Sequence, residues 1–199
     1  MNLTLEQIVE QLKRDRSFTD NVTQWKTIPA QEPGYSEFPK HLDTALINTL
    51  KERGIKNLYT HQATAIQSVF QGGNPVIVTP TASGKTLCYN LPVLQSILET
   101  RESRALYLFP TKALSQDQLT ELHEILHAVN RDIDFSIKSY TFDGDTPVSA
   151  RKAIKSSGHI VVTNPDMLHT GILPHHTQWI KLFENLKYIV IDEIHHYRE

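Results

Sequence analysis

The sequence predicts an α/β fold built on a doubly wound parallel sheet. Apolar runs alternate with segments whose apolar residues recur at helical spacing, and repeated strand–helix units of this kind imply a parallel sheet with helices on both faces. The runs are continuously apolar rather than alternating, as expected of strands that are buried on both faces. The expected strands are Val76–Thr79, Ala105–Phe109, Ile137–Phe142, Ile160–Val162 and Tyr188–Ile191.

The N-terminal part of the chain is expected to lie outside this sheet. Apolar residues recur at helical spacing over residues 3–14, which predicts a short helix. Residues 17–40 contain several prolines and little periodicity, which is typical of a linker that wraps over a surface. We therefore predict an N-terminal helix and linker over residues 1–40 and the α/β domain over residues 41–199.

Helices are expected to precede and connect the strands. The stretch from Leu42 to Leu50 has helical spacing, and Gly54 follows it as a stop signal. The further helices are expected near residues 60–71, 84–99, 113–129, 147–156 and 177–184.

Composition limits the classes of protein to consider. The 199 residues carry a formal net charge of −2, so the chain has no net positive charge that would indicate a nucleic-acid partner. Any binding of nucleic acid must therefore depend on the local arrangement of residues. The single cysteine, Cys88, leaves no disulfide framework and fits a reducing compartment. No apolar run reaches the roughly 18 residues of a membrane span, and no secretory signal is recognisable. We expect no membrane partner and a cytoplasmic location.

The segment from Thr79 to Thr86 predicts a phosphate-binding loop. It follows an apolar run and opens a helix, as the pattern G-x-x-x-x-G-K-[ST] requires, although Thr79 stands at the position of the first glycine. Backbone N–H groups of the loop and the positive end of the helix would face the phosphates. Lys85 would reach the β- and γ-phosphates, and the Thr86 hydroxyl would hold Mg²⁺. The loop residues between them are Thr81, Ala82, Ser83 and Gly84.

An acidic pair, Asp192-Glu193, follows the last expected strand. In a Mg²⁺-dependent NTPase, Asp192 would hold the metal, and Glu193 would orient and polarise the attacking water. The alternative is a solvated acidic turn. The phosphate loop favours the first interpretation, because ligands in such sheets bind at the carboxyl ends of the strands.

Other strand ends carry polar residues suited to a phosphodiester backbone. Thr111 and Lys112 follow the second strand, and Thr163 and Asn164 follow the fourth. Hydroxyls, amides and lysines are the groups that contact nucleic-acid phosphates. Ordinary helix capping is the alternative, since Thr and Asn also favour helix starts.

These motifs together resemble the first RecA-like domain of a superfamily 2 helicase of the DEAD/DEAH type, a P-loop NTPase. The sequences of these motifs are similar in particular to those of the bacterial MrfA/YprA-type (Hrq-like) DNA repair helicases. The matching stretches are Leu58 to Gln62 (the Q-type motif), Thr81 to Thr86 (motif I), Pro110 to Leu114 (motif Ia), Thr163 to Asp166 (motif Ib), Asp192 to His195 (motif II) and the Asp143-Gly144-Asp145-Thr146 turn. The resemblance covers about residues 40–199.

The resemblance implies a role for each matching residue. Gln62 would bond the adenine edge of ATP, and Tyr59, or the side of Leu58, would lie against the base. His195 would couple the ATP site to the nucleic-acid contacts. Lys85, Asp192 and Glu193 would form the catalytic set, and Thr111, Lys112, Thr163 and Asn164 would touch the strand backbone.

The resemblance also implies an ATP- and Mg²⁺-dependent DNA helicase that moves 3′→5′ on single-stranded DNA, with DNA favoured over RNA. It further implies a role in DNA repair, with a repair nuclease as an expected partner. The chain stops shortly after motif II, so we expect an incomplete first motor domain without motif III or a second motor domain. Such a piece is expected not to unwind DNA, to hydrolyse ATP very slowly and to self-associate through an uncovered sheet edge.

Three alternatives stay open at this point. A P-loop phosphotransferase would need an acceptor pocket and an arginine-rich lid, and neither is recognisable. An RNA helicase of the DEAD/DEAH type would share these motifs, because sequence does not expose the 2′-OH contacts that separate RNA from DNA. A non-catalytic module that binds ATP and nucleic acid is the third.

Overall fold

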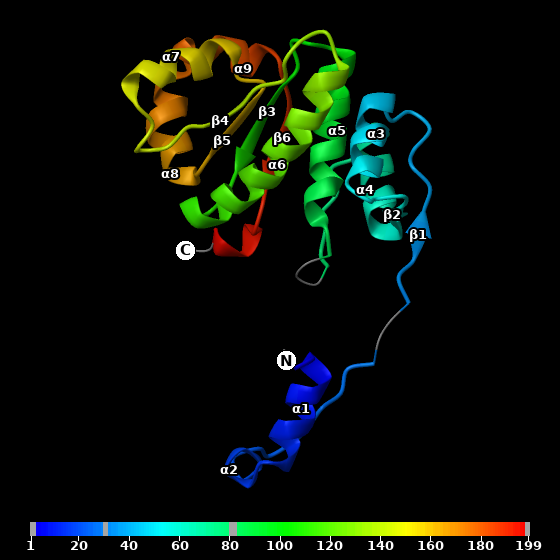
Figure 1. Ribbon diagram of the computed structural model, residues 1–199. Coiled ribbons are helices and arrows are strands. Elements are labelled where there is room, and N and C mark those ends of the chain that lie inside the picture. Colours follow the sequence, from blue (N-terminus) through cyan, green and yellow to red (C-terminus); the bar gives the residue numbers. More distant parts are fainter. Residues whose placement is uncertain (1–2, 30–31, 80–82, 198–199) are drawn as a thin grey trace. The chain divides into compact units, whose positions relative to one another are not determined.

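The computed structural model describes residues 3–29, 32–79 and 83–197 of the chain. By its internal contacts the chain divides into two compact units, Met1–Pro33 and Gly34–Glu199. The first unit carries the predicted N-terminal helix, and the second carries the sheet (Figure 1).

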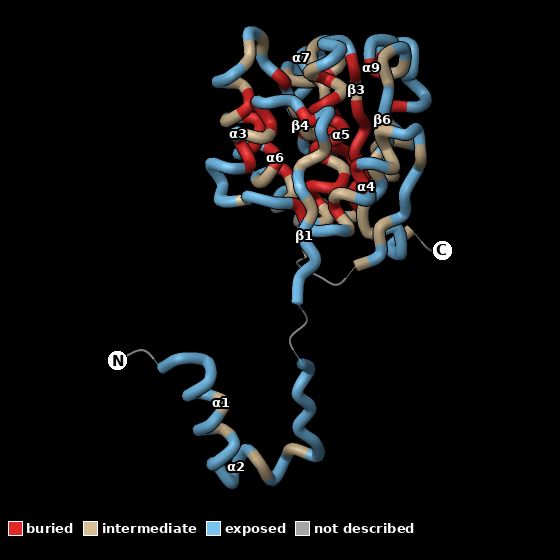
Figure 2. The backbone as a smooth tube through the Cα atoms, turned by 90° about the vertical axis from the view of Figure 1, so that its right-hand side faces the viewer, coloured by how far each residue is buried: buried red, intermediate tan, exposed pale blue. Residues whose placement is uncertain are grey.

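The first unit is a pair of short helices, α1 (Leu5–Arg14) and α2 (Arg16–Thr19). Thr4 and Gln7 form a capping box at the start of α1, which satisfies backbone N–H groups that the helix itself leaves unpaired. Asp15 ends α1 and also caps α2, by accepting a hydrogen bond from the backbone N–H of Ser17 at 2.9 Å. Neither helix buries a residue (Figure 2). Capping hydrogen bonds therefore stabilise these two helices, and burial in a hydrophobic core does not contribute.

The second unit is built on a parallel sheet with the strand order β4-β5-β3-β6. All three strand pairs are parallel, which confirms the predicted α/β class. The strands are β3 (Arg104–Leu108), β4 (Ser139–Thr141), β5 (Ile160–Thr163) and β6 (Leu186–Ile191). A two-residue antiparallel pair lies apart from this sheet, between β1 (Tyr35–Ser36) and β2 (Leu58–Tyr59).

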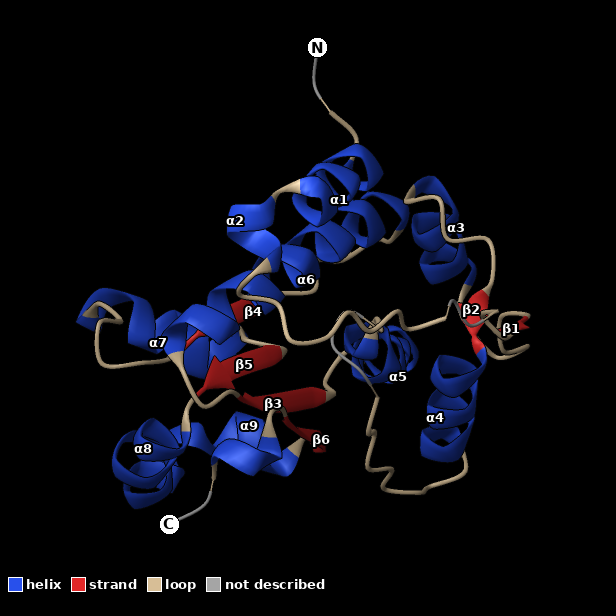
Figure 3. Ribbon diagram, turned by 90° about the horizontal axis from the view of Figure 1, so that it is seen from below, coloured by secondary structure: helices blue, strands red, loops and turns tan. Residues whose placement is uncertain are grey.

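Helices cover both faces of the sheet, as Figure 3 shows. The helices of this unit are α3 (Thr44–Glu52), α4 (Thr60–Phe70), α5 (Lys85–Glu99), α6 (Lys112–Asp132), α7 (Val148–Ser157), α8 (Pro165–Met167) and α9 (Ile180–Glu184). Between α8 and α9 the chain runs through a π-helical turn, η1 (Leu168–Ile172), and a 3₁₀ segment, η2 (Leu173–Trp179). A last 3₁₀ turn, η3, spans Ile194–His196.

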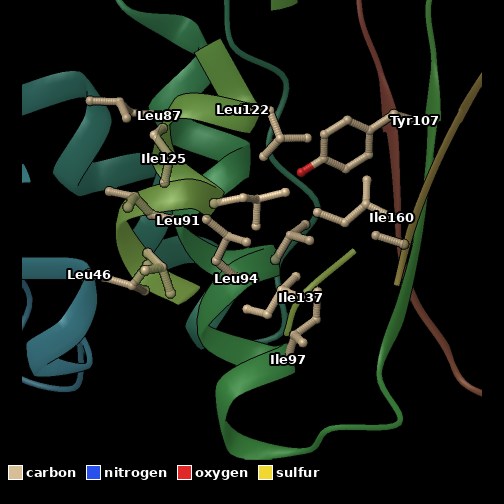
Figure 4. Packing of buried hydrophobic residues seen from close by; sticks show 14 of the residues in the cluster. Leu46, Leu87, Leu91, Leu94, Ile97, Tyr107, Leu122, Ile125, Ile137 and Ile160 are labelled. Atoms are coloured by element: carbon tan, nitrogen blue, oxygen red, sulfur yellow. The ribbon is translucent and has the colours of Figure 1, made fainter. Parts of the chain in front are cut away.

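Alternate residues of β3 enter two separate hydrophobic clusters, because successive side chains of a strand point to opposite faces. Ala105 and Tyr107 join the larger cluster with residues of α3, α5 and α6. Leu106 and Leu108 join the smaller one with Trp179 and residues of α7 and α9. Figure 4 shows the larger cluster, where leucines and isoleucines of α5 and α6 meet the sheet. This packing fixes the strand ends that carry the predicted site.

The prediction of a strand over Val76–Thr79 is wrong. This segment is not a strand, and Val76 and Val78 are 79% and 88% exposed. An isolated apolar run gains a strand conformation only from neighbours that pair with it and cover it. Among the described residues the sheet ends at β6, and nothing there pairs with this run.

The expected two-sided burial is also wrong for β6. All four residues of β5 are buried, whereas exposed and half-buried residues alternate along β6. Tyr188 and Val190 pack against the larger cluster, and Ile189 and Ile191 face away from it and are exposed. The α/β class is therefore correct, but beyond Leu186 the edge strand β6 is covered on one face only. Within the described ranges no helix has the length and apolarity needed to cross a bilayer.

Candidate functional site

The end of the phosphate loop is shaped by a glycine that no other residue can replace without strain. Gly84 precedes α5 and has a φ of +73°, in the left-handed region that favours glycine. A Cβ added at this position would lie 2.6 Å from Nε2 of Gln62. Both conditions place Gly84 where the predicted motif requires a glycine, at the N-terminus of the following helix.

Helix α4 holds this end of the loop through two side chains. Gln62 is only 2% exposed; its Nε2 donates to the carbonyl oxygen of Gly84 at 2.9 Å, and its Oε1 accepts from the backbone N–H of Tyr59 at 2.9 Å. Nε2 of His61 lies 3.0 Å from the carbonyl oxygen of Ser83. The amide of Gln62 is thus committed to backbone groups in this state, and its role toward adenine stays a prediction.

The loop closes on itself through Lys85 and two hydroxyls. Nζ of Lys85 donates to the carbonyl oxygen of Thr79 at 3.0 Å, and the hydroxyl oxygens of Thr79 and Ser83 are 2.6 Å apart. The ammonium group therefore points back across the loop, toward the space that a phosphate would occupy. Thr81 and Ala82, which were also predicted to bind the phosphates, lie outside the described residues.

Tyr59 stands in a ladder of aromatic rings beside the loop. Its ring stacks on Tyr35 at a centroid distance of 5.4 Å and on His61 at 5.7 Å, with interplanar angles of 20° and 11°. Tyr59 and Tyr35 are both exposed. The predicted contact between Tyr59 and the base stays a prediction.

Thr86, the predicted metal ligand, makes a contact that the sequence did not indicate. Its hydroxyl donates to Oε1 of Gln118, on α6, at 2.8 Å. The same oxygen accepts from the hydroxyl of Tyr89 at 3.1 Å. Gln118 was missed because no motif includes it, and only the packing of α6 on α5 brings it to Thr86.

Asp192 follows the last strand, as predicted. Its backbone N–H donates to the carbonyl oxygen of Leu108 at 3.0 Å, which fixes its main chain at the end of β3. Burial raises the pKa of its carboxyl above the usual value of 3.8, and the nearby Lys85 charge acts in the opposite direction. A bound cation would likewise favour the charged carboxylate.

The donor set of Thr86 and Asp192 fits Mg²⁺. Both side chains offer oxygen, which this hard cation prefers, and the half-buried carboxylate would gain from a cation beside it. Glu193, His195 and His196 form another group that could hold a metal, because their ligand atoms all lie within 4.8 Å of one another. Imidazole nitrogens suit zinc or copper rather than Mg²⁺, so this second group is not the expected Mg²⁺ site.

Glu193 adopts a backbone conformation that is rare for a residue with a side chain. Its φ is +49°, in the left-handed region, and its Oε2 lies 3.3 Å from Nδ1 of His195. Backbone strain of this kind clusters at functional sites. The predicted water-orienting residue and the predicted coupling residue are therefore in contact.

The residues predicted to touch nucleic acid occupy different environments. Thr111 is exposed, and Lys112 begins α6, although its side chain lies outside the described part of the chain. Thr163 is buried, and its hydroxyl donates to the carbonyl oxygen of Phe142 at 2.7 Å. Oδ1 of Asn164 caps α8 by accepting from the backbone N–H of Met167 at 2.8 Å. All four remain predicted contacts, and a contact through the Thr163 hydroxyl would require its present bond to break.

Residues of α6 also show the order of a zinc-protease motif. His123, Glu124 and His127 have the H-E-x-x-H spacing, in which two histidines bind zinc and the glutamate is the general base. Here Glu124 forms an ion pair with Arg53 at 2.8 Å. Across the described ranges, no group of three metal-ligating side chains includes these histidines. The site at the strand ends is therefore the better candidate.

Comparison with known proteins identifies the family to which the chain belongs. The family model of the DEAD/DEAH box helicases matches residues 59–199. The ATP-dependent helicase YprA of Bacillus subtilis, itself described as uncharacterized, is 54% identical over 98% of this chain, which covers 25% of YprA. The ATP-dependent helicase hrq1 of Schizosaccharomyces pombe is 41% identical over 98% of this chain, which covers 18% of hrq1.

A solved structure matches over nearly the whole chain as well. The crystal structure of the DUF1998 helicase MrfA bound to DNA and AMPPNP aligns with a TM-score of 0.88 and 54% identity, over 98% of this chain and 26% of that one. The chain thus spans about a quarter of the length of YprA and of MrfA. Its sheet and flanking helices form the RecA-like fold, and the chain belongs to the DEAD/DEAH box helicase family.

Proposed function

We propose that this chain is the N-terminal part of the motor domain of an ATP-dependent DNA helicase. It binds ATP with Mg²⁺ at the loop of Ser83 to Thr86 and contacts a nucleic-acid backbone at the neighbouring strand ends. The observation that carries the proposal is the convergence of Gln62, Gly84, Lys85 and Asp192. One hydrogen bond joins Gln62 to Gly84, and the charge of Lys85, the next residue, acts to lower the pKa of Asp192.

Each residue contributes a separate function in the proposed reaction. The backbone of the loop and the ammonium of Lys85 hold the phosphates, and Thr86 and Asp192 hold Mg²⁺. When bound, Mg²⁺ neutralises charge on the phosphate oxygens. The carboxylate of Glu193 orients and polarises the attacking water, and His195, 3.3 Å from it, links this carboxylate to the rest of the motor.

The proposal extends to the partners that the sequence suggested. Single-stranded DNA, favoured over RNA, is the proposed nucleic acid, with 3′→5′ movement, a role in DNA repair beside a nuclease, and a cytoplasmic location. The DNA-bound relative of 54% identity supports the choice of DNA. We also propose self-association, which the exposed Ile189 and Ile191 of β6 support. A chain that sediments as a monomer at every concentration would refute the self-association.

Nucleotide binding tests the proposal directly. Titration of the 199-residue chain with a fluorescent ATP analogue and Mg²⁺ is expected to saturate, and Lys85→Ala is expected to weaken binding roughly 10- to 150-fold. That range corresponds to the roughly 1.5–3 kcal/mol of a hydrogen bond to a charged group. Lys51→Ala is the matched control, because Lys51 is an exposed lysine on α3. Equal binding by both variants would contradict the proposed site.

Turnover and nucleic-acid preference separate the helicase from its alternatives. The chain by itself is expected to hydrolyse ATP very slowly, with no DNA-stimulated turnover near ~1 s⁻¹, the low end for enzymes. Matched DNA and RNA strands, titrated over a range of salt concentrations, should give tighter binding to DNA and a salt dependence that reflects phosphate contacts. Tighter binding to RNA would favour the RNA-helicase alternative. If Lys85→Ala leaves the activity of the full-length protein unchanged, the chain is a non-catalytic binding module.

A further inference from the structure

The hydrogen bond between Thr86 and Gln118 determines the direction in which the Thr86 hydroxyl points. A threonine hydroxyl has one proton to donate and two lone pairs to offer. Oε1 of Gln118 has no proton, so the Thr86 hydroxyl is the donor in their 2.8 Å contact. The proton is therefore directed toward α6, and the lone pairs of the Thr86 oxygen point elsewhere.

Gln118 is itself held in place from the other side. The Tyr89 hydroxyl donates to the same Oε1 at 3.1 Å. A tyrosine hydroxyl carries one proton to donate. Two O–H donors thus converge on one carbonyl oxygen, and both belong to α5, one turn apart.

The side chains around Gln118 are mostly aromatic or aliphatic. Tyr89, Tyr107, Gln118, Leu119 and Leu122 line a gap beside the junction, and this gap is too small to admit a water molecule. If the amide were lost, the Thr86 hydroxyl would lose the acceptor of its proton. The hydroxyl would then be free to rotate or to turn its proton toward the metal.

We propose that Gln118 is a positioning residue of the Mg²⁺–ATP site: by accepting the Thr86 proton, it keeps the lone pairs of that oxygen available to the metal. The inference rests on the proposed function above. Partners that orient a metal ligand from outside typically account for about 10- to 100-fold in metal affinity. Gln118 would act in this way through Thr86, without touching the metal.

The position of Gln118 on α6 gives this contact a second consequence. Helix α6 begins at Lys112, a predicted nucleic-acid contact, and the helix is continuous from there to Asp132. The helix that would meet the DNA backbone thus also carries the partner of the metal-binding hydroxyl. A displacement of the start of α6 would be transmitted along the helix to Thr86.

Replacing Gln118 in the 199-residue chain tests the inference. Gln118→Met keeps the length of the side chain and its helix propensity but removes the acceptor, whereas Gln118→Glu keeps an acceptor oxygen. Mn²⁺ binding, measured by electron paramagnetic resonance with a non-hydrolysable ATP analogue, is expected to weaken about 10-fold or more in Gln118→Met. It should stay equal or become tighter in Gln118→Glu. Gln116→Met is the matched control, because Gln116 is an exposed glutamine on the same helix.

The outcomes distinguish this inference from the proposed function. Failure of the wild-type chain to bind Mn²⁺ with the nucleotide would contradict the proposed function itself. Normal binding by the wild type and unchanged Mn²⁺ affinity in Gln118→Met would overturn only the role of Gln118. Nucleotide affinity in EDTA should be the same in all variants; an equal loss with and without metal would indicate general damage and refute a metal-specific role. If Gln118→Met does not fold, weaker Mn²⁺ binding by Gln118→Glu would overturn the inference.

Discussion

Two neighbouring strands of the sheet, β3 and β6, have very different surroundings. Leu106 of β3 and Ile189 of β6 are paired in register, but Leu106 is 2% exposed and Ile189 is 57% exposed. The buried strand lies between two hydrophobic clusters, whereas β6 packs against the larger one through Tyr188 and Val190 and against the smaller one only through Leu186 at its start. Two equally apolar strands thus differ in burial, because hydrophobic clusters pack along both faces of β3 but, beyond Leu186, along only one face of β6.

The core and the candidate site also differ in how their residues are held in place. Gly84, Lys85, Asp192 and Glu193 all lie on loops or at element ends, and hydrogen bonds hold them more than apolar packing does. Binding and catalytic groups are commonly placed on such loops, which a rigid scaffold positions. Here β3, β5, α5 and α6 form the scaffold, and the phosphate loop and the end of β6 carry the chemistry.

The largest effect is expected from truncating the two paired residues. Leu106→Ala should lower the free energy of unfolding by about 2–5 kcal/mol, because it leaves a cavity in a closed cluster. Ile189→Ala should cost less than about 1 kcal/mol, since more than half of its side chain surface is already in water. Urea denaturation of both variants measures the difference. Similar costs at the two positions would show that β6 is covered in solution.

A smaller effect is expected at the loop. Gly84→Ala forces a side chain into a left-handed conformation, which costs about 1–2 kcal/mol, and brings its Cβ against Nε2 of Gln62. Thermal unfolding should report that cost, and titration with a fluorescent ATP analogue should report weaker binding. Gly144→Ala is the control, because an added Cβ would meet nothing within 4 Å and the φ of Gly144 is not positive. Equal stability of the two variants would refute the strained geometry at Gly84.

The smallest effect should be a gain in stability. The pKa of Asp192 is raised in the folded state, so its charged form opposes folding and its contribution to stability is lost as pH rises through that pKa. Asp192→Asn keeps an acceptor for the N–H of Glu193. At pH 7 the substitution should raise the free energy of unfolding by on the order of 0.5 kcal/mol, the low end of the range for single stabilising substitutions.

The sign of this effect can be checked by changing the pH. The gain should shrink as pH falls through the raised pKa and below 3.8, because at still lower pH the carboxyl is protonated in both the folded and the unfolded states. Urea denaturation at several pH values measures this trend. A gain that grows at low pH would contradict a raised pKa.

Local sequence patterns predicted much of the fold and of the site. Helical spacing located α5 and α6, and continuous apolar runs located β3 and β5 within one or two residues. The order of residues in the loop identified Gly84, Lys85 and Thr86, because phosphate binding requires those residue types in consecutive positions. The Asp192-Glu193 pair was found in the same way, since its signal is an apolar run followed directly by two acids.

Contacts between distant segments were decided by the tertiary structure alone. The run of Val76 to Val78 is as apolar as β5, yet it forms no strand, because burial depends on neighbours that a local pattern does not contain. No sequence pattern predicts the hydrogen bond between Gln118 and Thr86, because the two residues are separated by 32 positions. The sequence by itself determined which chemical groups stand at the strand ends. Packing determined which of them are covered and which partners orient them, because burial and hydrogen bonding depend on distance in space rather than along the chain.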